Sequence, residues 1–219
     1  MLQAVLFDMD GVLIDSEPFH HRITKDLFQE LKLTISSEEY NGFIGLSFPE
    51  MWKRINASYR LEQTLPEIID LNRNRIMSYL KNSEQQAIPG VVALLERLKS
   101  EQIELAVASS SPLPYIELVL EKLAIRDFFR VLVSGEGVER GKPAPDIFLR
   151  AAELLKVTPE HCLVIEDSKN GVRAAKEAGM KCIGFRNINS GNQELSRADL
   201  IVERMDKLNY RVLEELFHS

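Results

Sequence analysis

The chain has 219 residues, and its 27 lysines and arginines against 33 aspartates and glutamates give a net charge of −6. A composition of 45% hydrophobic and 27% charged residues is typical of a soluble globular protein with one or two domains. The acidic balance argues against nucleic-acid binding, which usually needs a basic surface. No apolar run approaches the roughly 18 residues of a membrane span. We therefore expect no nucleic-acid or membrane partner.

The start of the chain and its cysteines predict where the protein works. The first three residues carry no basic region, and Asp8 and Asp10 interrupt the apolar stretch that follows, so we expect no signal peptide. The two cysteines, Cys162 and Cys182, are too few for a disulfide framework and lie in apolar runs. We expect a monomeric, cytoplasmic protein whose cysteines are buried thiols.

Six apolar runs recur along the chain and are too short for helices. They are apolar nearly throughout, instead of alternating with polar residues, which is typical of parallel strands covered on both faces. The predicted strands are Leu2–Phe7, Ile103–Ala108, Val131–Val133, Cys162–Ile165, Cys182–Phe185 and Leu200–Val202.

Helical patterns lie between these runs in the second part of the chain. The predicted helices are Val91–Lys99, Leu113–Leu123, Pro145–Leu155 and Lys169–Ala178. Ser111 and Pro112 have the residue types of an N-cap and a first helical position, and Gly179 stops the last helix. This alternation predicts an α/β fold with a doubly wound parallel sheet.

About seventy residues between the first and second strands show helical periodicity and no convincing strand. The predicted helices there are Phe19–Leu31, Ser37–Phe43, Pro49–Tyr59 and Leu65–Leu80. We interpret them as a helical cap domain, residues 16–86, inserted into a catalytic core formed by residues 1–15 and 87–219. The chain would cross between the two at Asp15–Pro18 and Ser83–Pro89, which are rich in polar residues or proline.

Polar side chains gather where four of the predicted strands end or lead onward. In a doubly wound sheet, ligands bind beyond the carboxyl ends of the strands. The side chains concerned are Asp8, Asp10, Ser109, Lys142, Glu166 and Asp167. A single strand end can be polar simply because a loop begins there. Several such ends, with carboxylates directly after apolar runs, predict one polar pocket at one edge of the sheet.

The residue types in this pocket predict its chemistry. Asp8 and Asp10 lie on one side if the strand geometry continues, and Asp167 adds a third carboxylate. Carboxylates this close repel one another unless a cation or proton lies between them. An all-oxygen cluster suits Mg²⁺, and the absence of His and Cys at these strand ends argues against zinc. Lys142 and the start of the helix after Ser111 could bind an oxyanion, so the pocket predicts a phosphate site.

Other phosphate and metal motifs do not fit the sequence. An EF-hand loop opening at Asp8 needs an oxygen ligand at Val12 and a glutamate at Phe19. A P-loop needs Ser or Thr where Pro143 stands, and a dinucleotide-binding motif needs Gly where Arg140 stands. No Gly-x-Ser-x-Gly elbow occurs in the chain.

Four segments together resemble the signature motifs of the haloacid dehalogenase superfamily of phosphotransferases. The first is Asp-Met-Asp-Gly-Val-Leu at 8–13, and the second is the strand that ends in Ser109. The third is Gly-Lys-Pro-Ala-Pro-Asp at 141–146, and the fourth is Val-Ile-Glu-Asp-Ser at 164–168. Their order and spacing match the family, as does a helical cap after the first motif. The branch that the chain resembles contains β-phosphoglucomutase-like enzymes and sugar-phosphate phosphatases.

The resemblance implies a role for each of these residues. Asp8 would be the nucleophile that forms an aspartyl phosphate, and Asp10 would be the general acid and then the general base. Ser109 would hydrogen-bond the transferring phosphoryl group, and Lys142 would neutralise its charge. The implied Mg²⁺ ligands are Asp8, the main-chain carbonyl of Asp10, Glu166 and Asp167.

The resemblance also indicates substrate-contacting residues in the cap. Gly45, Ser47 and Phe48 belong to a loop that matches the substrate-specificity loop of the branch, and His20 stands where mutase relatives carry a histidine near the hinge. A histidine at a helix start is more often a surface residue. Phe48 replaces an arginine that in the mutases holds the distal phosphate of a bisphosphorylated intermediate.

These observations predict a Mg²⁺-dependent phosphatase that hydrolyses a small phosphorylated metabolite, such as a sugar phosphate, through an aspartyl-phosphate intermediate. A sugar phosphomutase and a pyrophosphatase are the enzymatic alternatives. A phosphate- or metal-binding module without turnover is the alternative from another class. The pair Asp8 and Asp10 argues against such a module, because a binding protein would not need both carboxylates.

Overall fold

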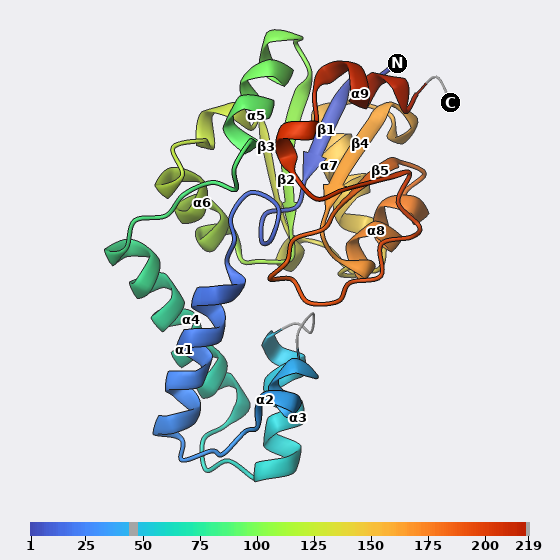
Figure 1. Cartoon of the computed structure of the whole chain (residues 1–219). Coiled ribbons are helices and arrows are strands. Elements are labelled where there is room, and N and C mark those ends of the chain that lie inside the picture. Colours follow the sequence, from blue (N-terminus) through green and yellow to red (C-terminus); the bar gives the residue numbers. More distant parts are fainter. Residues whose placement is uncertain (44–47, 218–219) are drawn as a thin grey trace.

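The computed structural model describes residues 1–43 and 48–217. Its centre is a six-stranded parallel sheet with the strand order β3-β2-β1-β4-β5-β6 (Figure 1). The strands are β1 (Ala4–Phe7), β2 (Glu104–Ser109), β3 (Val131–Ser134), β4 (Cys162–Glu166), β5 (Lys181–Phe185) and β6 (Leu200–Val202). The predicted parallel sheet is therefore confirmed, with strand ends that differ from the expected ones by one or two residues.

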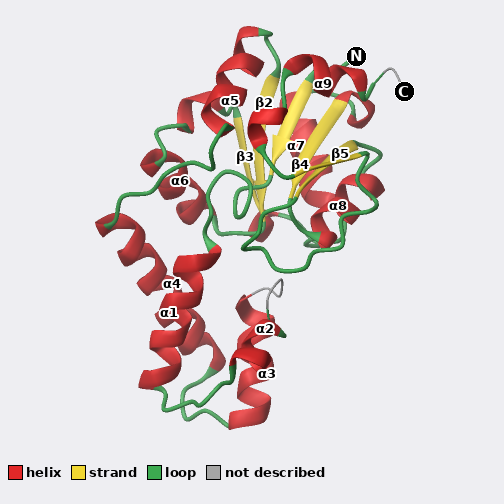
Figure 2. Cartoon of the chain, viewed as in Figure 1, coloured by secondary structure: helices red, strands yellow, loops and turns green. Residues whose placement is uncertain are grey.

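Helices cover both faces of the sheet, which explains why its strands are apolar throughout. Along β1, Val5 and Phe7 face the cluster that contains α5, α6 and α9, whereas Ala4 and Leu6 face the cluster that contains α7 and α8. These helices are α5 (Val91–Ser100), α6 (Leu113–Lys122), α7 (Asp146–Leu155), α8 (Lys169–Glu177) and α9 (Tyr210–Glu215). Figure 2 shows the sheet between the two helix layers.

The start of α6 differs from the expectation. The helix begins at Leu113, its N-cap residue is Pro112, and no side chain caps it. The prediction that Ser111 is the N-cap was therefore wrong. The hydroxyl group of Ser111 donates a hydrogen bond to Asp10 Oδ2 at 2.9 Å instead, so a tertiary contact replaces the local one.

In the described part of the chain, the predicted insertion after β1 consists of four helices, which lie beyond one end of the sheet (Figure 1). They are α1 (Glu17–Glu30), α2 (Ser37–Asn41), α3 (Phe48–Tyr59) and α4 (Leu65–Asn82). Ser36 caps α2 by accepting a hydrogen bond from the amide of Glu39, and Thr64 and Glu67 form a capping box at the start of α4. None of the helices in the described part of the chain combines the length and apolar character needed to cross a membrane.

The inserted helices have a hydrophobic cluster separate from the two clusters at the sheet. Its buried members are Leu27, Phe28, Met51, Trp52, Ile55 and Ile68. Trp52 is fully buried, and its ring meets that of Phe28 edge to face with centroids 5.4 Å apart. This cluster supports a separate cap, and the boundaries at residues 16 and 86 stay a prediction.

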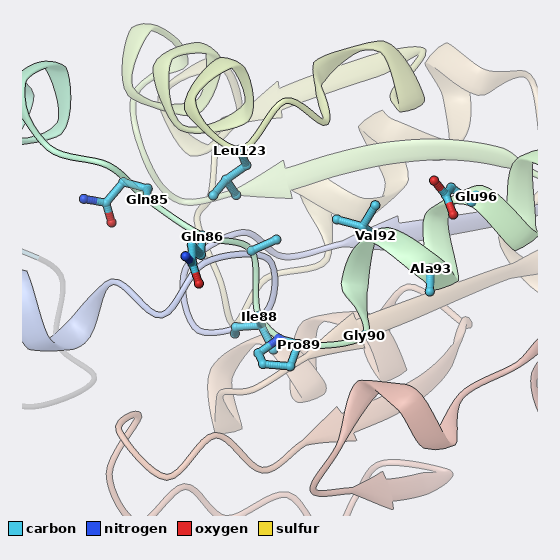
Figure 3. A pocket seen from close by; sticks show the side chains of 10 residues that line it. Gln85, Gln86, Ile88, Pro89, Gly90, Val92, Ala93, Glu96 and Leu123 are labelled. Carbon is cyan, nitrogen blue, oxygen red and sulfur yellow. The ribbon is translucent and has the colours of Figure 1, made fainter.

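The two chain segments that join the helical insertion to the sheet run side by side. Ile14 forms an antiparallel bridge with Ala87, and the amide of Ile88 donates to the carbonyl of Leu13 at 2.9 Å. An open hollow of about 580 Å³ lies on the return segment; Figure 3 shows that residues 85–90, the first half of α5 and Leu123 line it. The hollow therefore belongs to the junction and not to the polar strand ends.

A truncation in the cap cluster tests whether the cap is a separate folding unit. Phe28→Ala removes the ring that packs on Trp52, and we expect it to lower the free energy of unfolding by about 3–5 kcal/mol. Trp52 is the one tryptophan of the chain, so its fluorescence reports on the cap while far-UV circular dichroism reports on the whole chain. In the variant, the fluorescence transition in urea should precede the dichroism transition.

Leu71→Ala on α4 is the matched control, because Leu71 is 39% exposed and should cost less than about 1 kcal/mol. Coincident transitions by both probes in Phe28→Ala would mean that the cap and the core unfold as one unit.

Candidate active site

The site lies at the carboxyl ends of the two central strands. Asp8 directly follows β1, and its amide donates to the carbonyl of Ile165 in β4 at 3.0 Å. Ser109 ends β2 and Glu166 ends β4, on either side of β1. Strands β2 and β3 lie on one side of β1, and β4 to β6 lie on its other side, so the order of the strands reverses here. Such switch points are where doubly wound folds bind ligands.

The ammonium group of Lys142 contacts groups at three of these strand ends. Its Nζ donates to Asp8 Oδ1 at 2.5 Å, to Glu166 Oε1 at 2.7 Å and to the carbonyl of Ala108 at 3.0 Å. Burial disfavours the charged form of Lys142, but the carboxylates of Asp8 and Glu166 outweigh burial and raise its pKa. The ammonium group therefore stays charged at neutral pH.

The buried carboxylates outnumber this lysine. Burial is the main cause that raises the pKa of Asp8 to about 7, and the charges of Glu166 and Asp10 raise it further against the opposing effect of Lys142. Burial, then Glu166 and Asp8, raise the pKa of Asp167 well above its usual range. One ammonium group thus leaves the carboxylate cluster short of positive charge, and a bound cation would correct this deficit.

The donor set at this position fits Mg²⁺. Among residues 1–43 and 48–217, no three His, Cys, Asp or Glu side chains converge closely enough to enclose a metal by themselves. Mg²⁺ does not need such a cage, because it binds one or two carboxylates and keeps several waters. Asp8 and Asp167 are buried oxygen donors of this kind and could hold the ion.

Both carboxylate oxygens of Glu166 accept hydrogen bonds from the protein. Its Oε1 accepts from Lys142, and its Oε2 accepts from the amide of Ser168 at 2.8 Å and from the Ser168 hydroxyl at 2.9 Å. A Cβ at Gly171 would lie 1.7 Å from Oε1, so the helix that follows can approach only through a glycine. Glu166 is therefore held in contact with Lys142.

Hydrogen bonds from the loop after β5 hold Asp167 in place. The hydroxyl of Ser190 donates to Asp167 Oδ2, and the side-chain amide of Asn187 donates to the carbonyl of Gly11 at 3.0 Å. Gly11 has φ +78°, and a Cβ there would lie 2.0 Å from Asp167 Oδ2. Asn189 donates to Asp15 at 2.6 Å, which links the same loop to the start of the insertion. The predicted site residues did not include Ser190, Asn187 or Asn189, because no sequence motif surrounds them.

Asp10 contacts a second group of polar residues. Its Oδ2 accepts from Ser111, and its Oδ1 accepts from the Tyr115 hydroxyl at 3.1 Å. The Tyr115 hydroxyl also meets Nε2 of His20 at 2.9 Å. Burial and the Asp10 carboxylate raise the pKa of Tyr115 well above its usual value, so this hydroxyl keeps its proton. Burial raises the pKa of Glu17, at the start of α1, to about 7, with Asp10 and Asp15 adding to the effect.

His20 thus contacts the site through Tyr115, and burial lowers its pKa. Ser109 is buried, and its hydroxyl accepts from the amide of Ser111 at 3.1 Å. Of the other predicted cap residues, Gly45 and Ser47 lie outside the described residues. Phe48 begins α3, but its side chain is not among those described.

The predicted site residues included neither Tyr115 nor Ser111 as a contact of Asp10. The run of three serines that begins with the last residue of β2 was a usable signal for Ser111. Tyr115 lies on the buried face of α6 and reads as an ordinary core residue.

Known proteins are similar to this chain in sequence and architecture. The model of the haloacid dehalogenase-like hydrolase family matches residues 5–185. The β-phosphoglucomutase of Bacillus subtilis (strain 168) is 32% identical over 98% of this chain and 95% of its own length. The phosphorylated carbohydrates phosphatase of Thermotoga maritima is 33% identical over 83% of this chain and 84% of its own length.

The solved structures give the same result for the fold. A crystal structure of mutant CbbY from Rhodobacter sphaeroides in complex with xylulose-(1,5)bisphosphate is 29% identical, with a TM-score of 0.86. The similarity covers 95% of this chain and 96% of that one. With a family match over most of its length and the same fold as a solved relative, the chain belongs to the haloacid dehalogenase-like hydrolase family.

Proposed function

We propose that the protein is a Mg²⁺-dependent phosphatase that hydrolyses a small phosphorylated metabolite, in particular a sugar phosphate. The observation that carries the proposal is the contact of Lys142 with Asp8 at 2.5 Å, beside a second, separately held aspartate, Asp10. This arrangement offers a carboxylate nucleophile, a cation for the phosphate and a carboxylate for proton transfer within one site. The relatives named as a sugar phosphomutase and a carbohydrate phosphatase support it.

In the first half-reaction, an oxygen of Asp8 attacks the phosphorus and the bond to the leaving oxygen breaks. Asp10 gives its proton to that oxygen, and an aspartyl phosphate remains on Asp8. In the second, Asp10 takes a proton from water, the water oxygen attacks the phosphorus, and phosphate leaves with Asp8 restored. Mg²⁺, held by Asp8, Asp167 and the carbonyl of Asp10, would supply Lewis-acid stabilisation of the phosphoryl oxygens.

Two further residues have supporting roles in this proposal. Lys142 neutralises charge on Asp8 and on the bound phosphoryl group, and Ser109 hydrogen-bonds that group. Glu166 holds Lys142 in place, because both of its oxygens already accept hydrogen bonds from the protein. We therefore assign Glu166 to the lysine and not to direct metal ligation.

Hydrolysis is favoured over mutase activity by the charges of the cap. A mutase must bind a second phosphate away from the metal, and arginine suits this because its planar group binds phosphate bidentately. Phe48 carries no charge, Arg73 pairs with Glu136 of the core at 3.2 Å, and Arg75 pairs with Glu30. Both arginines that could replace the missing charge are thus engaged with carboxylates. The CbbY relative, by contrast, was crystallised with a bisphosphate.

The same proposal includes the setting of the enzyme. We propose a cytoplasmic monomer with a core of residues 1–15 and 87–219, a cap of residues 16–86, and no nucleic-acid or membrane partner. The net charge of −6 and the two free, buried cysteines support it.

Replacing the proposed nucleophile tests the reaction. Asp8→Asn keeps the size of the side chain and removes the attacking oxyanion, so phosphate release from p-nitrophenyl phosphate with Mg²⁺ should fall at least about a thousandfold. The fold should survive, because the change also removes one of the repelling buried charges. Asp70→Asn, at an exposed position of α4, is the matched control and should keep full activity. Substantial turnover by pure Asp8→Asn would remove Asp8 from this role.

The pH dependence of metal binding tests the ligand set. A proton on Asp8, whose pKa is about 7 without a metal, competes with Mg²⁺ for the same oxygens. The apparent Mg²⁺ affinity should therefore be highest above neutral pH and should fall about tenfold for each pH unit below about 7. Titration calorimetry over this range measures it directly, and EDTA should stop turnover until Mg²⁺ is restored. Full restoration by zinc instead would contradict the all-oxygen site.

A product assay separates phosphatase from mutase. With β-glucose 1-phosphate, Mg²⁺ and a trace of glucose 1,6-bisphosphate, the protein should release inorganic phosphate faster than it forms glucose 6-phosphate. The reason is that Phe48 supplies no cation for a second phosphate, and Arg73 and Arg75 are paired with Glu136 and Glu30. Faster formation of glucose 6-phosphate would mean that Arg73, Arg75 or another cap residue supplies that charge.

A further inference from the structure

Tyr115 connects the second aspartate to the cap. It lies on α6 of the core with 5% of its surface exposed, and its ring belongs to the main hydrophobic cluster. Its hydroxyl donates to Asp10 Oδ1 at 3.1 Å and meets His20 Nε2 at 2.9 Å. His20 belongs to α1, so the hydroxyl connects α6 to the loop after β1 and to the first helix of the insertion.

The two hydrogen bonds on Asp10 fix the plane of its carboxylate. Ser111 binds Oδ2 and Tyr115 binds Oδ1, and both donors come from the segment that leaves β2. One donor would leave the carboxylate free to rotate about its terminal bond, whereas donors on both oxygens restrict that rotation. A proton-transfer group needs this restriction, because its oxygen must reach the reacting atom within hydrogen-bond distance.

His20 in turn fixes the hydroxyl of Tyr115. Because the Tyr115 proton is directed at Asp10, the hydrogen between His20 and the hydroxyl oxygen belongs to Nε2 of His20. The two rings meet at 90° with centroids 6.0 Å apart. The Ser16 side chain also hydrogen-bonds this hydroxyl. With His20 as donor, the hydroxyl directs its own proton toward Asp10.

We infer that Tyr115 is a positioning residue that directs the carboxylate of Asp10 toward the oxygen of the leaving group. His20 of the cap holds the Tyr115 hydroxyl in position for this. This inference rests on the proposed phosphatase reaction, and it assigns a role to a residue outside the four signature motifs. The Tyr115 ring remains packed when its hydroxyl is removed, so positioning and packing can be separated by Tyr115→Phe.

The test compares two substrates that differ in how much they need an acid. Phenol has the acidity of a tyrosine side chain, with a pKa of about 10, so phenyl phosphate needs proton donation as its oxygen leaves. The p-nitrophenolate ion is stable at neutral pH, and p-nitrophenyl phosphate needs no such donation. The measured quantity is kcat/KM with Mg²⁺, which reports the first phosphoryl transfer for each substrate.

In Tyr115→Phe, kcat/KM should fall about tenfold for phenyl phosphate and less than twofold for p-nitrophenyl phosphate. Tenfold is a part of the roughly 10²–10⁴ that a general acid contributes, as expected when the acid remains but is less well aimed. His20→Leu should show the same selective loss, and the double variant should lose no more than Tyr115→Phe, because both changes act through one hydroxyl. The His20→Leu result also carries the test if Tyr115→Phe does not fold.

Tyr210→Phe is the matched control, because it removes a tyrosine-to-carboxylate hydrogen bond of 3.0 Å, to Glu214, on the surface helix α9. It should change neither substrate. An equal loss on both substrates, or no loss on either, in Tyr115→Phe would overturn the positioning role while the phosphatase proposal stands. Failure of the unaltered protein to release phosphate from both substrates would instead overturn the phosphatase proposal itself.

Discussion

Lys142 lies buried between Asp8 and Glu166, and its ammonium group donates to both carboxylates. The three groups come from the ends of β1 and β4 and from the segment after β3. Their contacts therefore connect these parts of the chain at the carboxyl edge of the sheet. Removing the lysine would leave the buried carboxylates without a compensating charge, which is strongly unfavourable. The carboxylates still outnumber the lysine, and burial together with the charges of Glu166 and Asp10 raises the pKa of Asp8.

The shortage of positive charge at the site affects both the stability of the free protein and its binding of ligands. Three buried carboxylates beside one lysine are unfavourable in the free protein, and a cation together with a phosphate changes the balance of charge at the site. The protein holds this arrangement with rigid neighbours: Gly171 admits α8 against Glu166, and Gly11 admits the Asp167 carboxylate against the loop after β1. The surrounding contacts therefore maintain the unfavourable charges in position before any ligand arrives.

The hydrogen-bond partners of Asp10 differ from those of Asp8. In the part of the chain that the structure describes, its carboxylate makes no hydrogen bond with Lys142 and is held by Ser111 and Tyr115 instead. Two aspartates two residues apart thus occupy different environments, one buried against a lysine and one bound by hydroxyl groups. Such a difference is how one site can supply both a nucleophile and a group that transfers protons.

The sequence by itself determined the sheet, the helical insertion and the residues at the strand ends. Apolar runs, helical periodicity and carboxylates directly after strands are local properties of the chain, and Asp8, Ser109, Glu166 and Asp167 could be named from them. Tertiary structure decided the partners. Tyr115 meets Asp10 across 105 positions, and Ser190 meets Asp167 across 23, at places that no local pattern marks. It also decided the pKa of Asp8, because burial and neighbouring charge arise only when distant segments pack together.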